Sequence, residues 1–243
     1  MKKILITAPV RQDPDIFAEY LKALDALEVP DGCEIERFFV INECPEVIPL
    51  LRDTDRWTTY KTVCEYLKTH NDHIWTLDNM DNMARMRNMT IVHALENWCD
   101  YWWSVDSDVM VRPETLRTLL QANKDIVSEI FWTRAPSGKY WCNAWMEDQA
   151  SGMPEEWRKP GLYACGMTGA CTLVKREVLD RGVNYSRIPN IRTALRGEDR
   201  HFCVRAACAG YQCWIDSHVP AEHLYTRELY NQYMAGRKGN ADV

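Results

Sequence analysis

A β-prone run that ends in two aspartates constrains this chain more than any other feature. Residues 101–105 read Tyr-Trp-Trp-Ser-Val, and Asp106-Ser107-Asp108 follows at once. Side chains two positions apart on an extended chain point to the same side, so Asp106 and Asp108 present two carboxylates where a buried strand emerges. Two close carboxylates repel unless a cation lies nearby. The pattern predicts a site for a divalent metal and a phosphate-bearing ligand; the alternative is an ordinary turn, which Asp and Ser also favour.

The bulk composition allows one globular domain and disfavours several partners. Of the 243 residues, 46% are hydrophobic and 26% are charged, which is ordinary for a soluble protein. The net charge of −6 provides no overall basic field to attract nucleic acid or anionic lipid. No stretch approaches the roughly 18 apolar residues of a membrane span.

The cysteines favour a reducing compartment. Ten of them are scattered along the chain with no CxxC pair, which argues against a disulfide framework or a zinc site. Several lie in apolar runs, where free cysteine acts as a small hydrophobe. The apolar run from Met1 to Pro9 is too short for a secretion signal and is expected to form a strand. We therefore expect reduced thiols and a cytoplasmic location.

Strand-like and helical segments alternate along the first half of the chain. We expect strands at 3–8, 33–42, 74–77, 101–105, 125–132, 171–174 and 211–216, and helices at 15–27, 45–51, 57–68, 82–98, 113–121 and 198–209. Residues 134–163 mix Pro, Gly, Trp and charge, which is typical of an irregular or hairpin insertion. The alternation predicts an α/β fold with a mainly parallel sheet, whose ligands bind at the carboxyl ends of strands.

Two further motifs could bind phosphate or a sugar. Arg85 and Arg87 lie in the first turns of the predicted helix 82–98, where both the helix N-terminus and arginine favour anions. Gly166 and Gly169 belong to a segment whose glycines permit close approach of a ligand to the backbone. The alternatives are solvent-exposed arginines and a plain turn before a strand.

Two motifs in the last quarter of the chain could add a base and a metal ligand. Glu198 and Asp199 follow Gly197 at the start of a predicted helix, where they either complement the helix dipole or serve as a general base and acceptor-binding carboxylates. His218 and His223 follow the predicted last strand, and a histidine there could complete an oxygen and nitrogen shell of the kind manganese accepts. A purely structural histidine is the alternative.

The order of these motifs resembles that of the GT-A-fold glycosyltransferases, and among them the broad family-two-like group. The series comprises a Pro-Val-Arg loop after the first strand, Ala-Arg-x-Arg-Asn, DxD, a glycine segment, Gly-Glu-Asp and a C-terminal histidine, and it covers the chain from Ile4 to about Leu224. The resemblance implies a Rossmann-like sheet with a smaller mixed β subdomain on the acceptor side. It also implies a single domain over 1–235, with a nucleotide-binding half (1–108), an acceptor and metal half (109–235) and a flexible tail (236–243).

The resemblance further implies roles for individual residues. Those expected to bind the nucleotide sugar are Pro9, Val10, Arg11, Asn42 or Glu43, Asp78 with Asn79, Arg85, Asp106, Ser107, Gly166 and Gly169. Asp106, Asp108 and His223 would hold Mn²⁺ or Mg²⁺, with His218 as the competing histidine. Asp199 would be the catalytic base, with Glu198 beside it on the acceptor side. The first-strand loop reads Pro-Val-Arg-Gln-Asp rather than the commoner Pro-x-Tyr-Asn, which leaves the base contacts open.

The implied reaction is metal-dependent transfer of a sugar from a UDP-sugar, or a GDP-sugar, to an acceptor hydroxyl. Inversion is favoured with Asp199 as base, and retention stays open. The acceptor could be a glycan, protein, lipid, small molecule or nucleic acid, and the tryptophan-rich segment 132–157 is where we expect it. A nucleotidyltransferase is one alternative, although residues 8–15 lack the glycine of its usual signature. A non-catalytic carbohydrate- or nucleotide-binding relative and a metal-dependent hydrolase are the others, and the oligomeric state is open.

Overall fold

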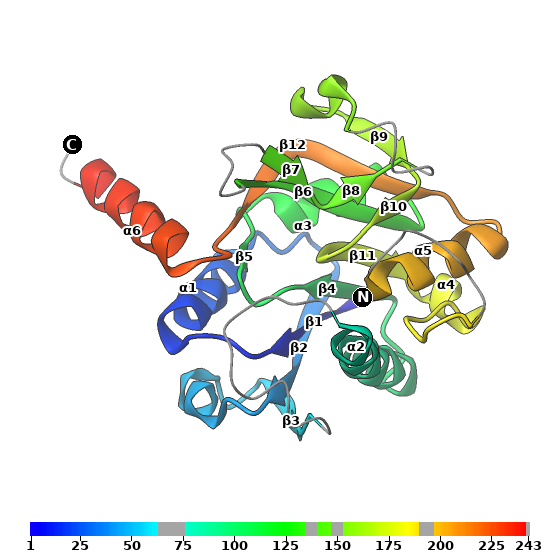
Figure 1. Cartoon of the computed structure of the whole chain (residues 1–243), viewed down its shortest axis with the longest axis horizontal. Helices are drawn as coiled ribbons and strands as arrows, with labels where there is room; N and C mark the ends of the chain where they lie inside the picture. Colours follow the sequence, from blue (N-terminus) through cyan, green and yellow to red (C-terminus); the bar gives the residue numbers. More distant parts are fainter. Residues whose placement is uncertain (63–75, 135–139, 147–152, 190–196, 242–243) are drawn as a thin grey trace.

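A computed structural model describes residues 1–62, 76–134, 140–146, 153–189 and 197–241. Its main feature is a ten-stranded sheet with helices on both faces (Figure 1). The strands of this sheet are β1 (Lys2–Val10), β2 (Cys33–Asn42), β3 (Arg56–Tyr60), β4 (Tyr101–Val105), β5 (Val109–Met110), β6 (Ile126–Arg134), β7 (Tyr140–Cys142), β9 (Leu162–Cys165), β11 (Cys171–Lys175) and β12 (Cys213–His223). A separate two-stranded sheet pairs β8 (Ala144–Trp145) with β10 (Met167–Thr168).

The strand order is β3-β2-β1-β4-β11-β6-β12-β5, with β7 attached to β6 and β9 attached to β12. The strands β3, β2, β1 and β4 are parallel to one another, and β6 is parallel to β12. Only β11 interrupts this central run, since it is antiparallel to both β4 and β6. The expected α/β class with a mainly parallel sheet is confirmed.

The helices divide between the two faces of the sheet. They are α1 (Pro14–Asp25), α2 (Leu77–Glu96), α3 (Thr115–Ala122), α4 (Arg176–Asp180), α5 (Glu198–Cys208) and α6 (Arg227–Ala241), with 3₁₀ turns η1 (Pro45–Leu50) and η3 (Glu155–Arg158). Buried residues of α1 and α3 join one core, and those of α2, α4 and α5 join the other. Within the described residues, no helix is both long and apolar enough to cross a bilayer.

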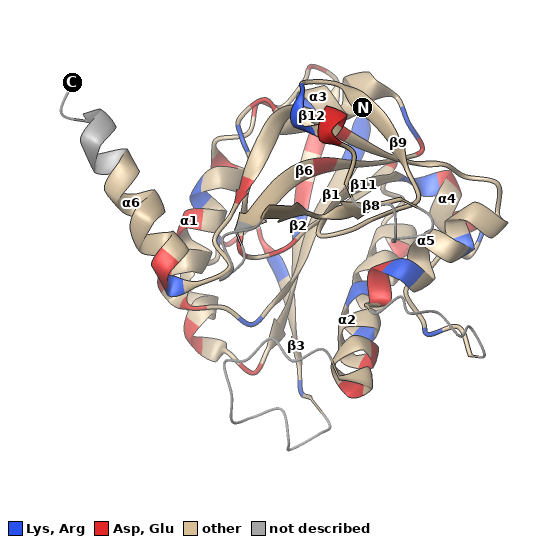
Figure 2. Ribbon diagram, turned by 45° about the horizontal axis from the view of Figure 1, so that its top comes forward, with Lys and Arg blue, Asp and Glu red and all other residues tan. Residues whose placement is uncertain are grey.

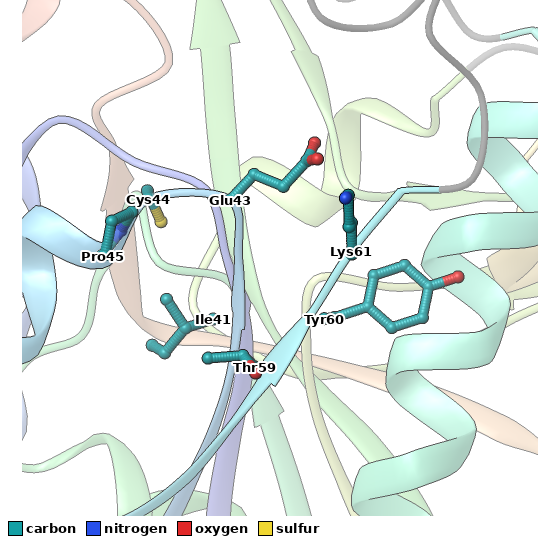
Figure 3. A pocket seen from close by; sticks show the side chains of 7 residues that line it. All are labelled: Ile41, Glu43, Cys44, Pro45, Thr59, Tyr60 and Lys61. Atoms are coloured by element: carbon teal, nitrogen blue, oxygen red, sulfur yellow. The ribbon is translucent and has the colours of Figure 1, made fainter.

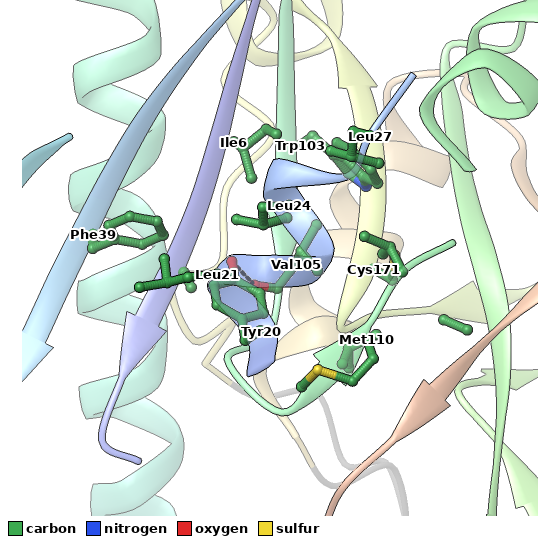
Figure 4. Close-up of a cluster of buried hydrophobic side chains, with 14 of the residues drawn as sticks. Ile6, Tyr20, Leu21, Leu24, Leu27, Phe39, Trp103, Val105, Met110 and Cys171 are labelled. Carbon is green, nitrogen blue, oxygen red and sulfur yellow. Dashed lines mark hydrogen bonds between the residues drawn. The ribbon is translucent and has the colours of Figure 1, made fainter. Parts of the chain in front are cut away.

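The central strand β4 supplies one tryptophan to each core. Trp102 and Trp103 are adjacent, so they point to opposite faces, and both are fully buried. Trp102 donates a hydrogen bond to Thr90 Oγ1 of α2 at 3.0 Å. Trp103 packs in the α1 core, where the Tyr20 hydroxyl donates to the carbonyl of Val105 at 3.0 Å (Figure 4). Both helix layers thus pack against β4, the strand that ends directly before Asp106.

Charged residues are distributed along the helices. Figure 2 shows basic and acidic segments interspersed along α2 and α5. The cysteines in the described residues are free thiols. The cytoplasmic location expected from them stays a prediction.

Several expected boundaries differ from the structure. Residues 56–60 form the edge strand β3, where a helix over 57–68 was expected, and residues 63–68 lie outside the described part. Leu77 begins α2 rather than ending a strand, because the Thr76 hydroxyl caps the helix by accepting from the Asn79 amide at 3.2 Å. The last strand continues to His223, well past the expected end at 216. Helix α6 extends to Ala241, and the flexibility expected of residues 236–243 stays a prediction.

One carboxyl group lies in the middle of the sheet without a partner. Glu129, on β6, is fully buried, and neither of its carboxylate oxygens has a hydrogen-bond partner in the described residues. Its register neighbour on β12 is the buried Asp216. Burial raises the pKa of Glu129 to about 9, and the charge of Asp216 acts in the same direction. The side chain is therefore protonated at neutral pH.

The raised pKa of Glu129 predicts a pH-dependent loss of stability. The native state keeps a proton that the unfolded chain releases near pH 4.3, so this contribution is complete below that pH and is lost as the pH rises towards about 9. The stability of the wild type should fall by on the order of 4 kcal/mol between pH 5 and pH 8 relative to that of Glu129→Gln, which cannot titrate. Urea unfolding at both pH values measures this, with the exposed Glu177→Gln as control. Parallel pH profiles for the wild type and Glu129→Gln would contradict it.

Candidate active site

A buried arginine organises the carboxyl edge of the sheet. Arg87 of α2 has a side chain that is only 2% exposed. Its Nη2 lies 2.9 Å and 3.1 Å from the two carboxylate oxygens of Asp106. Its Nε donates to Glu198 Oε1 at 3.2 Å and lies 4.0 Å from Asp199 Oδ1. Burial opposes the positive charge, but Asp106, Asp199 and Glu198 outweigh it and raise the pKa of Arg87 well above its usual value.

The sheet beneath Arg87 is lined with small hydroxyl side chains. Ser104, the one polar residue within β4, accepts a hydrogen bond from Arg87 Nη1 at 2.7 Å. The register places Thr7, Thr172 and Ser128 in the same row across β1, β11 and β6. Paired residues share one face of a sheet, so these short side chains leave room for the guanidinium. The serine in Tyr-Trp-Trp-Ser-Val is thus explained by its partner on α2.

The second aspartate of the pair meets a histidine from the far end of the chain. His223 Nε2 lies 3.4 Å from Asp108 Oδ2, and the Leu224 amide donates to the carbonyl of Asp108 at 2.8 Å. The other ring nitrogen, Nδ1, is 2.7 Å from Thr133 Oγ1 on β6. His218 is instead 49% exposed and pairs with Asp216 at 2.9 Å. Of the two candidate histidines, the structure brings His223 to the aspartates.

The groups around Asp108 fit a divalent cation in part. In the described ranges, no set of three or more His, Cys, Asp or Glu side chains is placed so that it could hold a metal ion. Asp106 Oδ1 is nevertheless buried and accepts no hydrogen bond there, although it lies near Arg87. Burial raises the pKa of Asp106 to about 6, against the effect of Arg87. Carboxylates and an imidazole are ligands that Mn²⁺ or Mg²⁺ accepts, and Asp108 and His223 already lie 3.4 Å apart, but Asp106 Oδ1 lies 2.9 Å from Arg87 Nη2. The expected metal site of Asp106, Asp108 and His223 therefore stays a prediction.

Asp199 packs against a glycine that no other residue could replace without movement. A Cβ placed on Gly169 would lie 2.3 Å from Cγ and Oδ2 of Asp199. The neighbouring Ala170, at φ 66°, accepts a hydrogen bond from the Asp106 amide at 2.8 Å. Residues 169 and 170 thus contact both Asp199 and Asp106. Gly166 lies between β9 and β10, and its amide donates to the carbonyl of Trp145 on β8 at 2.9 Å.

The surroundings of Asp199 raise its pKa. Burial, with Glu198 beside it, raises the pKa of Asp199 well above its usual range, while Arg87 opposes the rise. Its Oδ1 is buried and accepts no hydrogen bond from the described residues. A carboxylate whose pKa lies closer to neutrality is a better general base. Glu198, only 2% exposed, is directed at Arg87 and holds it in place.

Arg85, which was expected to bind the donor, lies elsewhere. It is exposed, and it lines a groove of about 570 Å³ with Phe38, Met89 and Val92 rather than facing the aspartates. Two positions on a helix differ by about 200°, so Arg85 and Arg87 cannot face one site together. Of the two arginines that the sequence offers, Arg87 is the one that contacts Asp106 and approaches Asp199.

Most of the residues predicted to contact the base and the ribose lie at strand ends. Pro9 and Val10 are buried at the end of β1, and Arg11 is exposed just beyond it. Asn42 ends β2, where its side chain accepts from Thr62 Oγ1 at 3.0 Å. Asp78 and Asn79 were expected at a strand end, but they lie in the first turn of α2, with Asp78 exposed. Ser107 is buried between the two aspartates.

A cavity lies beside the ends of β2 and β3. Its volume is about 310 Å³, and it is lined by Ile41, Glu43, Cys44, Pro45, Thr59, Tyr60 and Lys61 (Figure 3). Glu43 adopts a left-handed backbone with φ 53°, and its side chain is exposed. The thiol of Cys44 donates to the carbonyl of Val10 at 3.2 Å, which ties the cavity to the end of β1. Parallel strands end at the same edge, so the cavity and Asp106 share that edge.

The fold and these residues define the class of GT-A-fold glycosyltransferases. The family model described as glycosyltransferase family 25, N-terminal domain, matches residues 49–177, which are 129 of the 243 residues. The chain belongs to this family.

Curated relatives match over a limited stretch. The human procollagen galactosyltransferase 2 is 24% identical over 119 residues, which are 46% of this chain and 19% of that protein. Procollagen galactosyltransferase 1-A of Xenopus laevis is 30% identical over 69 residues, which are 28% of this chain and 11% of that protein. The matched region is thus less than a fifth of either relative.

Solved structures share the fold along most of the chain. TarS 1–349 of S. aureus in complex with UDP has a TM-score of 0.54 and 16% identity, over 91% of this chain and 60% of that chain. The mannosyltransferase PcManGT of Pyrobaculum calidifontis, in complex with GDP-Man and Mn²⁺, has a TM-score of 0.53 and 15% identity, over 95% and 59%. At this identity the likeness concerns the fold alone.

Removal of the Arg87 side chain should destabilise the protein. Arg87→Met would leave Asp106, Glu198 and Asp199 close together without their shared cation, so we expect a loss of about 3–5 kcal/mol in the free energy of unfolding. Arg85→Met, two positions away and exposed, is the matched control and should change stability by less than about 0.5 kcal/mol. Urea unfolding at pH 7 measures both. If the two substitutions lowered the free energy of unfolding equally, Arg87 would not stabilise the protein more than an exposed arginine does.

Proposed function

We propose that this protein transfers a sugar from a nucleotide-sugar donor to an acceptor hydroxyl, with inversion at the anomeric carbon. The observation that carries the proposal is the convergence of Asp106 and Asp199 on Arg87 at the carboxyl edge of the sheet, with the Asp108–His223 pair beginning two residues after Asp106. Membership of a glycosyltransferase family supports the reaction class.

The donor is proposed from the neighbouring structures and the cavity. TarS has been solved with UDP and with UDP-GlcNAc, and PcManGT with GDP-Man, so a UDP-sugar or a GDP-sugar is the donor we propose, with UDP favoured. The cavity lined by Glu43 and Tyr60 is the site proposed for the base, next to Pro9 and Val10. Asp106 and Ser107 follow at the end of β4, towards the ribose and the diphosphate.

The residues divide the reaction between a leaving-group side and an acceptor side. Asp199 accepts the proton of the acceptor hydroxyl, whose oxygen forms the new bond to the anomeric carbon. The bond from that carbon to the diphosphate breaks, and the electron pair leaves with the nucleoside diphosphate. Arg87 holds Asp199 and Asp106 in a fixed relation during this exchange. Asp106, Asp108 and His223 would hold Mn²⁺ or Mg²⁺, which supplies positive charge beside the leaving diphosphate when bound.

The first test is metal-dependent release of nucleotide from a donor. We would incubate the protein with UDP-, GDP-, CMP- and dTDP-sugars, with and without Mn²⁺, and quantify the free nucleotide. We expect release from one donor, its loss with EDTA, and no release by Asp108→Ala. His223→Ala should raise the Mn²⁺ concentration for half-maximal rate by about 10- to 100-fold, because it removes a neighbour of Asp108.

His218→Ala is the matched control for the metal experiment. This histidine lies on the same strand but pairs with Asp216, so the Mn²⁺ dependence should stay at the wild-type value. If no nucleotide were released from any donor, and UDP with Mn²⁺ did not change the melting temperature, the proposed function would be contradicted.

The second test concerns the base. Asp199→Asn keeps the shape of the side chain against Gly169 but cannot accept the proton, so we expect turnover to fall by roughly 10²-fold or more. The shift in melting temperature caused by UDP and Mn²⁺ should be retained, because the donor side is unchanged. A full-rate Asp199→Asn enzyme would show that another group takes the proton, and the anomeric configuration of the product, read by NMR, tests inversion.

A further inference from the structure

Three arginines of this protein stack on tryptophan rings. The distances from the guanidinium carbon to the ring centroid are 4.2 Å for Arg158 over Trp132, 4.6 Å for Arg176 over Trp98 and 5.2 Å for Arg200 over Trp145. Stacking occupies one face of the guanidinium and leaves its N–H edge free for hydrogen bonds. What meets that edge differs among the three pairs.

Two of the arginines have a carboxylate of their own chain at the edge. Arg158 Nε lies 3.4 Å from Glu155, and Arg176 Nε lies 3.2 Å from Asp180. Arg200 has no carboxylate within 4.0 Å among the residues that the structure describes, and its polar contact there is a weak one, from Nη1 to the sulfur of Met167 at 4.0 Å. Arginine carries five N–H donors and keeps its charge, so most of the donor capacity of Arg200 is unused.

The partial burial of Arg200 favours an anionic partner for its unpaired N–H groups. The side chain is half-buried, and desolvation lowers its pKa, with Asp199 acting in the opposite direction. A cation partly removed from water gains more from an anionic partner than an exposed one does. A carboxylate or a phosphate fits the edge of a guanidinium with two parallel hydrogen bonds.

The position of this pair relates it to the acceptor side. Arg200 follows Asp199 in the first turn of α5, and its side chain reaches across Met167 of β10 to Trp145 of β8. Gly169, against which Asp199 packs, follows β10 directly. The Trp145–Arg200 pair therefore adjoins the proposed base.

We propose that Trp145 and Arg200 form an acceptor subsite that binds a carboxylate or a phosphate group carried by the acceptor. Arg200 binds the anionic group through its N–H edge, and Trp145 holds the guanidinium in place. The reactive hydroxyl of the same acceptor then lies towards Asp199. This inference rests on the proposed glycosyl transfer and adds to it the chemical class of the acceptor.

The test compares probes that differ in one group. Binding of methyl β-glucuronide and of methyl β-glucoside to the protein with UDP and Mn²⁺ would be measured by calorimetry, and glucose 6-phosphate would be compared with glucose in the same way. We expect each anionic probe to bind at least about tenfold more tightly than its neutral partner. Arg200→Gln should abolish that difference, and Arg200→Lys, which keeps the charge without the fork, should restore part of it.

Arg158→Gln is the matched control, since Arg158 is also stacked on a tryptophan but already has Glu155. It should keep the full preference for the anionic probes. Equal affinity for anionic and neutral probes, no binding of either, or a preference that survives Arg200→Gln would overturn the subsite. Donor hydrolysis by the wild type, measured without acceptor, reports on the proposed function separately. A protein that hydrolyses a donor but shows no anion preference would retain the function and lose this inference.

Discussion

The pairing of one buried cation with a ring of carboxylates governs the arrangement of this molecule. Arg87 is 2% exposed, and a charge so far from water is tolerated only with close, well-directed partners. Its partners come from β4 and from the start of α5, which lie far apart in the sequence. The arginine thereby fixes the distance between the strand that ends in the aspartate pair and the helix that carries Asp199.

The same constraint explains why the backbone around the site is so closely packed. Three acidic groups share one guanidinium, so Asp199 has to approach the sheet, and it does so over a residue with no side chain at position 169. Ala170 takes up a left-handed conformation next to it and accepts the Asp106 amide. The site is therefore held mainly by rigid elements and short hydrogen bonds, which is the preorganisation that charge development in a transition state requires.

Much of the fold could be predicted because its strands are strongly apolar and its helices amphipathic. The strand at 33–42 was predicted with its observed ends, and β4 and the start of α5 were predicted at the positions where they occur. Strand β3 was not, because this edge strand has exposed Trp57 and Thr59 and contains no buried residue, so it lacks the apolar run that would mark it. The roles of Arg85 and Arg87 could not be separated from the motif, because the two residues lie about 200° apart on α2 and only the packing of the helix on the sheet decides which one faces inward. The choice between His218 and His223 depended on a register shift within β12, between Asp216 and Ala221, which spacing alone does not reveal.

The order of strands in the sheet has a consequence for how the protein is made. Strand β6 lies between β11 and β12, and both of these partners come later in the chain. As the chain leaves the ribosome, the segment Ile126–Glu129 of β6 is made before β11 and β12, so both of its edges are unpaired at first. The strands β1, β2 and β4 can already associate at that stage. The carboxyl group of Glu129, still charged and hydrated at that stage, would keep this apolar segment soluble until its neighbours arrive. A residue that weakens the finished sheet at high pH would then protect the nascent one from pairing with other chains.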